Sequence, residues 1–137
     1  MRLIKEIIVH CTATPEGKDY GAKDIDRWHR AQGWDGIGYH YVVRLDGTVE
    51  KGRADSARGA HCVNHNAQSI GVVYVGGISG ADGTMPKDTR TPAQKQSLRI
   101  LLSVLRAVYP EARIYGHRDF AAKACPCFDA KTEYKDL

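Results

Sequence analysis

Side chains that could do chemistry gather in residues 115–127, which run YGHRDFAAKACPC. This stretch supplies an imidazole, a carboxylate, an ammonium and two thiols, and its proline and small residues disfavour a regular helix. Imidazole nitrogens and thiolate sulfurs bind zinc, so His117 and Cys125 are candidate ligands. Two ligands make neither a structural nor a catalytic zinc site, so a metal here requires a further ligand from elsewhere in the chain.

His10 is the candidate for that further ligand. Residues 3–12, LIKEIIVHCT, are rich in β-branched side chains and predict a buried strand. Side chains alternate across a strand, so His10 and Cys11 face opposite ways. The strand end where His10 lies is a common place for ligands in α/β folds. A hydrogen-bonded histidine without a metal is the alternative for His10, and Cys11 is interpreted as a small core residue.

The other strands and helices must position these side chains. The pattern indicates a helix over 22–34 with Asp24 as N-cap, strands over 38–44 and 48–51 joined by an Asp-Gly turn, a strand over 69–75, a helix between Thr91 and Pro110, and a strand over 112–115. This order, without repeats or a linker, predicts an α/β fold. We expect a single domain over residues 1–137, with a mixed central β-sheet and helices packed on its faces.

The order of the elements also predicts where a metal site could form. His117 follows the last strand directly, so it can meet His10 at one edge of the sheet, with Cys125 on the loop that returns past them. Three protein ligands and one open position for water or a substrate carbonyl form a catalytic zinc site. These three residues are thus a candidate zinc site, but each of them alone is more often structural, and the sequence spacing does not show that they converge.

A loop beside this site is predicted for residues 59–66, GAHCVNHN. Its His61, Cys62 and His65 allow substrate contacts or a second metal cluster, but solvent-facing polar residues are the more common explanation. Tyr39, on the predicted strand 38–44, is by default a packing residue with a hydrated hydroxyl.

Composition and charge are those of an ordinary globular protein. Hydrophobic residues make up 42% and charged residues 26% of the 137 residues, and the net charge is +4. The basic residues are scattered along the chain, so we expect no nucleic-acid partner. No apolar run is long enough to cross a membrane, so we expect no membrane partner either. No feature of the sequence requires an oligomer, and we expect a monomer. Charges among the first six residues disfavour a signal peptide, and the four cysteines then suit metal binding or free thiols better than disulfides.

Short blocks along the chain resemble the zinc-dependent N-acetylmuramoyl-L-alanine amidases of the phage-lysozyme type, whose fold is similar to that of peptidoglycan recognition proteins. The blocks keep the family's order and span almost the entire chain. They are residues 10–14 (HCTAT), 36–41 (GIGYHY), 46–53 (DGTVEKGR), 69–77 (SIGV to GG), 91–94 (TPAQ) and 116–126 (GHRD with KACP).

The resemblance implies hydrolysis of the amide bond between N-acetylmuramic acid and L-alanine in bacterial peptidoglycan, by a phage or prophage lysis enzyme. Such a protein is made in the bacterial cytoplasm without a signal peptide and acts on the cell wall after release. The site residues that the resemblance implies are the zinc ligands His10, His117 and Cys125, the catalytic Tyr39 and Lys123, and the substrate-binding His61.

Two other functions fit part of the sequence. A peptidoglycan-binding domain would hold the muropeptide without cutting it, but non-catalytic relatives commonly lose the thiolate that Cys125 supplies here. A regulator that binds a polymerase or another protein would need neither zinc nor hydrolysis. The extension associated with that role in phage relatives is longer than the nine residues before His10. Cys127, where a small polar residue is expected, is interpreted as an unligated side chain rather than a competing thiol.

Overall fold

The computed structural model describes residues 2–80 and 84–137. A five-stranded sheet in the order β4-β3-β5-β1-β7 forms its centre. The elements are β1 (Glu6–Cys11), β2 (Thr14–Pro15), α1 (Ala22–Ala31), β3 (Tyr41–Val43), β4 (Val49–Lys51), β5 (Ser69–Tyr74), β6 (Gly77–Ile78), α2 (Pro92–Val108), β7 (Arg113–Gly116) and α3 (Ala130–Glu133), with 3-10 turns at Asn66–Gln68 and His117–Asp119. β5 pairs in parallel with β1 and β3, and β7 with β1, whereas β4 runs antiparallel to β3. The predicted α/β fold with a mixed sheet is confirmed.

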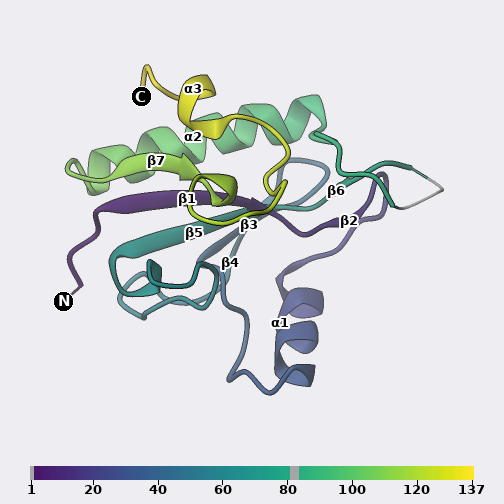
Figure 1. The fold of residues 1–137 in the computed structure, drawn as a ribbon, viewed down its shortest axis with the longest axis horizontal. Helices are drawn as coiled ribbons and strands as arrows, with labels where there is room; N and C mark the ends of the chain where they lie inside the picture. The colour runs from purple at the N-terminus through teal and green to yellow at the C-terminus, as the bar shows by residue number, and fades with distance from the viewer. Residues whose placement is uncertain (1, 81–83) are drawn as a thin grey trace.

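Helices cover both faces of this sheet, as Figure 1 shows for α2 above and α1 below. On one face of the sheet, Leu98 and Leu102 of α2 are buried in the same core as Val9 of β1. On the other face, Ile25 of α1 is buried with Val73. Since side chains alternate along a strand, β5 contributes Val72 to the first core and Val73 to the second, and its residues are buried on both faces.

The two long helices begin differently. In α2, the Thr91 hydroxyl accepts the Gln94 N–H at 3.0 Å and so caps the helix. In α1 the N-cap is Gly21, so the prediction of Asp24 as N-cap is wrong. The Asp24 carboxylate lies one turn further on and accepts the Gly21 N–H at 2.8 Å, where its charge still favours the helix start. The helix also ends at Ala31, three residues earlier than predicted, because the chain turns at a glycine with φ of +92°.

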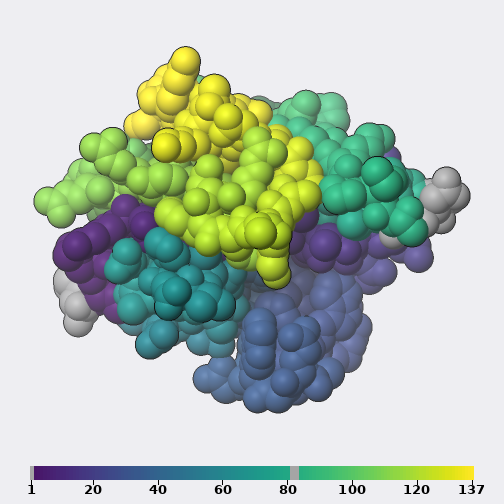
Figure 2. Space-filling view, in the orientation of Figure 1, coloured from purple at the N-terminus to yellow at the C-terminus, as the bar shows by residue number. Residues whose placement is uncertain are grey.

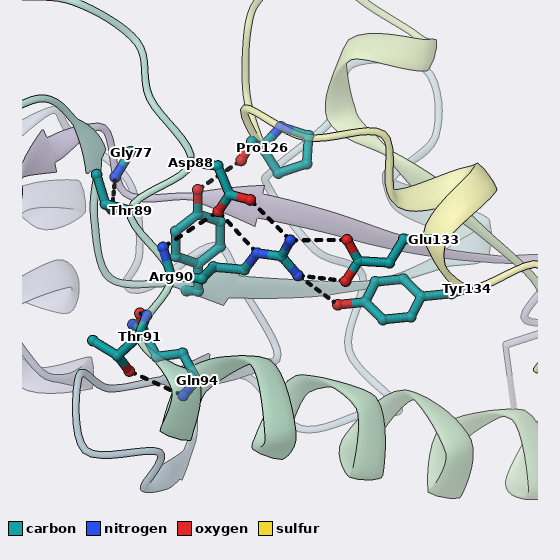
Figure 3. A network of polar contacts seen from close by, with 10 residues as sticks. Gly77, Asp88, Thr89, Arg90, Thr91, Gln94, Pro126, Glu133 and Tyr134 are labelled. Atoms are coloured by element: carbon teal, nitrogen blue, oxygen red, sulfur yellow. Dashed lines mark hydrogen bonds and ion pairs between the residues drawn. The ribbon is translucent and has the colours of Figure 1, made fainter.

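A buried arginine fixes the C-terminal segment to the start of α2 (Figure 3). The Arg90 guanidinium donates to both oxygens of Asp88 and of Glu133 at 2.7 to 2.9 Å, and to the Tyr134 hydroxyl at 3.0 Å. Its side chain is only 2% exposed and lies 3.4 Å from the centroid of the Phe128 ring. Charge-assisted contacts with this planar geometry are strong and directional. They hold the end of the loop that leads away from β7.

The short elements were not predicted from the sequence. The β2 and β6 strands pair over two residues each, and α3 has four. Elements of this length are too short to show a hydrophobic period. Among the helices of residues 2–80 and 84–137, none has the length and apolar content of a membrane span.

Candidate active site

The three predicted metal ligands lie together at the carboxyl edge of the sheet. β1 and β7 are parallel neighbours with Val9 paired to Gly116, so His10 and His117 follow at adjacent positions. One ligand atom from each of His10, His117 and Cys125 lies within 4.8 Å of the other two. The structure therefore brings together the three residues that the sequence suggested.

The surroundings of these ligands favour the protonation states that bind a metal. A hydrogen bond from the Cys11 thiol and another from the Cys11 backbone N–H, at 3.1 Å, hold the pKa of the Cys125 thiol below its ordinary value although burial opposes them. Burial lowers the pKa of His10 well below its usual value and also lowers the pKa of His117. A thiolate and two neutral imidazoles are the forms that bind zinc, so this donor set fits that ion.

His10 is oriented by a second histidine. Its Nδ1 lies 3.9 Å from Sγ of Cys125, and its Nε2 lies 2.8 Å from Nδ1 of His61. On its other side, Nε2 of His61 lies 3.1 Å from Oγ of Ser69. Burial lowers the pKa of His61 to about 3, so this ring is neutral. His61 thus contacts a candidate ligand directly, in addition to facing the cleft described next.

A cleft of about 420 Å³ opens beside the ligands and is lined by Tyr39, His61, His117 and Lys123. Figure 2 shows one face of the molecule on which the yellow-green segment after β7, the teal segment around residues 59–66 and the blue segment around α1 meet. The cleft therefore draws its walls from parts of the chain that are far apart in the sequence.

Tyr39 and Lys123 supply hydrogen-bond donors to this cleft. The Tyr39 ring centroid lies 5.1 Å from that of His10. Burial and the neighbouring thiols of Cys125 and Cys11 raise the pKa of Tyr39, so its hydroxyl stays protonated. Lys123 is exposed, and its positive charge contributes to the lowered pKa of His117.

The model of one protein family, N-acetylmuramoyl-L-alanine amidase, matches residues 1–128. The chain belongs to this amidase family. Among curated proteins, the endolysin of Klebsiella phage KP32 is 48% identical over 126 residues, which cover 92% of this chain and 82% of that endolysin. The endolysin of Escherichia phage T7 is 47% identical over 125 residues, covering 91% and 82% of the two chains.

Solved structures show the same relationship. The amidase fold here matches the N-acetylmuramoyl-L-alanine amidase LysC from Clostridium intestinale with a TM-score of 0.79 at 30% identity, over 95% of this chain and 80% of that one. Bumblebee PGRP-SA matches with a TM-score of 0.78 over 98% and 81% of the two chains, but at 23% identity this likeness shows the fold alone.

Some residues of the amidase cleft were not singled out from the sequence. Trp34 and Val63, which are 41% and 80% exposed, line it together with Phe120. Exposed apolar side chains on loops follow no period, so the sequence offered no signal beyond the presence of an aromatic residue after α1. Only the fold shows that they border one cleft.

The 59–66 loop is less exposed than its composition suggested. Cys62 is buried, and His65 has Nδ1 2.8 Å from a Glu6 carboxylate oxygen while its ring stacks on Phe120 with centroids 3.9 Å apart. In residues 2–80 and 84–137, the group formed by His10, His117 and Cys125 is the only cluster of three or more His, Cys, Asp or Glu arranged to hold a metal. The possible second cluster on this loop therefore does not form in the described part of the chain.

Cys127 lies outside the three-ligand group. Its Sγ is 3.4 Å from the Gly77 carbonyl oxygen and 4.0 Å from Sγ of Cys11. The interpretation of Cys127 as an unligated side chain stays a prediction.

Proposed function

We propose that the chain hydrolyses the amide bond between N-acetylmuramic acid and L-alanine in bacterial peptidoglycan, with zinc held by His10, His117 and Cys125. The observation that carries this proposal is the convergence of these three side chains within 4.8 Å beside an open cleft. Membership of the amidase family supports the reaction, and the lowered pKa of Cys125 supports the metal. Bound there, zinc would polarise the scissile carbonyl and lower the pKa of a water molecule toward neutrality.

The chain's own residues would perform the remaining steps. Attack on the amide creates a negatively charged oxygen, and the Tyr39 hydroxyl and the Lys123 ammonium are donors in the same cleft that can stabilise it. Either group can also deliver the proton that the departing L-alanine nitrogen requires. Because the pKa of Tyr39 is raised, its hydroxyl carries that proton at neutral pH.

The lining of the cleft suits an amphipathic substrate. Trp34, Val63 and Phe120 give it an apolar wall, while Asn66, His61 and Lys123 add polar groups. A glycopeptide presents both kinds of surface, and we propose that His61 contributes to binding it. We further propose that residues 1–137 act as one catalytic domain and a monomer, in a phage or prophage lysis enzyme that reaches the wall after release from the cell. The endolysins among its relatives support this role.

The test is the identity of the product. Purified protein is incubated with purified sacculi, and new L-alanine N-termini and stem peptides are measured by mass spectrometry. We expect free stem peptides beginning with L-alanine, together with glycan strands stripped of peptide, and their loss in a Tyr39→Phe variant that still binds the sacculi. Binding to sacculi without any release of stem peptides would favour the recognition domain instead.

A further inference from the structure

The pocket around His61 is built to receive an imidazole. Gly71 lies on β5 beneath the ring, and a Cβ atom there would come within 2.6 Å of Cδ2 of His61. A Cβ atom on Gly59 would come within 2.5 Å of the same atom. The backbone N–H groups of His61 and Cys62 donate to Oδ1 of Asn66 at 2.8 and 2.9 Å, which fixes the loop above the sheet. The two glycines therefore leave the space that the ring fills, and Asn66 fixes the loop that carries it.

The hydrogen bonds of this ring determine which nitrogen of His10 is free. Nδ1 of His10 faces the Cys125 sulfur, so it is the nitrogen that can bind the metal and it must carry no proton. The proton of His10 then lies on Nε2, which donates to Nδ1 of His61 over 2.8 Å. His61 must accept there, so its own proton lies on Nε2 and is donated to the Ser69 hydroxyl, 3.1 Å away. Ser69 is completely buried, and its hydroxyl is the last group in this chain of hydrogen bonds from His10 through His61.

We propose that His61 is a positioning residue, which together with Ser69 holds His10 in the tautomer and ring orientation that bind the metal. This inference rests on the proposed zinc site. Metal-bound histidines almost always donate their second N–H to a carboxylate, a carbonyl or a water molecule. In this chain a buried imidazole has that role, and the partners on both sides of it are protein groups. A role in substrate contact alone would require neither the bond to His10 nor the bond to Ser69.

The experiment measures zinc affinity by competition with a chromophoric chelator, using the purified protein of residues 1–137 and three substitutions. His61→Leu removes the acceptor while filling the space, and we expect a loss of roughly 10- to 100-fold in affinity. His61→Asn places an amide oxygen near the position of Nδ1, and we expect it to recover most of that loss. Ser69→Ala leaves the ring in its slot without its acceptor, and we expect a smaller loss in the same direction.

His65→Leu is the matched control, because it removes a histidine from the same loop that contacts Glu6 and Phe120 and not His10. We expect its zinc affinity to equal that of the unsubstituted protein, and circular dichroism of each zinc-free variant reports whether it is folded. The proposal is overturned if folded His61→Leu binds zinc as tightly as the unsubstituted protein and only its KM for muropeptide rises. It is also overturned if the His61→Asn variant binds zinc no more tightly than the His61→Leu variant. An unsubstituted protein that binds no zinc would instead overturn the metal assignment, and that result is separate from any comparison of variants.

Discussion

The backbone N–H of Cys11 donates to Sγ of Cys125 over 3.1 Å, across 114 residues of sequence. This contact joins the end of β1 to the loop that follows β7, and it places one candidate ligand beside His10, the residue that precedes Cys11. It also stabilises the thiolate, because a donor to sulfur favours the charged form. One backbone group thus contributes to both the geometry and the charge of the site.

Cys125→Ser should reduce zinc binding strongly. A serine hydroxyl is far less acidic than a thiol, so it does not supply the negative ligand that this position offers. We expect substoichiometric zinc after dialysis and loss of hydrolysis of sacculi, measured by metal analysis and product release. Cys127→Ser is the matched control two residues away, and it should keep its zinc because Cys127 contacts Gly77 and Cys11 instead. Equal zinc content in the two variants would show that the third ligand is wrongly assigned.

Lys123→Ala should separate chemistry from metal binding. Lys123 lines the cleft without belonging to the ligand group, so we expect zinc content to remain while kcat falls on the order of 10²-fold, as for loss of one oxyanion donor. Lys131→Ala removes a lysine that borders a different hollow and should leave kcat unchanged. The measurement is steady-state release of L-alanine N-termini from a soluble muropeptide. A change confined to KM would assign Lys123 to binding and not to the chemical step.

Much of this site follows from local sequence patterns. A histidine at the end of a β-branched run and another just after a short strand both predict side chains at a sheet edge, and parallel pairing of β1 with β7 brings them together. The Thr91 cap of α2 is equally local, since donor and acceptor lie three residues apart.

The contact between His10 and His61 could not be predicted in this way. Its partners are 51 residues apart, and it depends on the space left by Gly71 on β5 and on an irregular loop folding back over the sheet. The exposed Trp34 joins the cleft for the same reason, because the placement of loops depends on tertiary packing and not on a period in the sequence.

Arg90→Met should destabilise the whole fold. It removes the shared hydrogen-bond donor of the Asp88 and Glu133 carboxylates, whose side chains are 30% and 41% exposed, so we expect a loss of about 1 to 3 kcal/mol in the free energy of unfolding. Arg99→Met breaks the exposed pair with Asp136 and should cost less than about 1 kcal/mol. Urea unfolding followed by circular dichroism measures both. Similar losses in the two variants would contradict the role given to the buried arginine.

Acid should weaken the same network. Hydrogen bonds from Arg90 hold the pKa of Glu133 below its usual value, against the effect of burial. A carboxyl group with a lower pKa in the folded state stabilises the fold above its unfolded pKa of about 4.3 and loses that contribution as the pH falls through the folded value. We expect the free energy of unfolding to decrease below about pH 5 and to decrease less steeply in Glu133→Gln. Parallel pH profiles for the two proteins would rule out this contribution.

The central claim is that catalysis requires one zinc ion at His10, His117 and Cys125, and reconstitution tests it most directly. Zinc per chain and the rate of L-alanine N-terminus release from sacculi are measured before chelation, after removal of the metal, and during titration with Zn²⁺. The account predicts one zinc per chain at full activity, none after chelation, and recovery that saturates at one equivalent. Full activity in the metal-free protein, or a full equivalent of zinc retained by Cys125→Ser after dialysis, would contradict it.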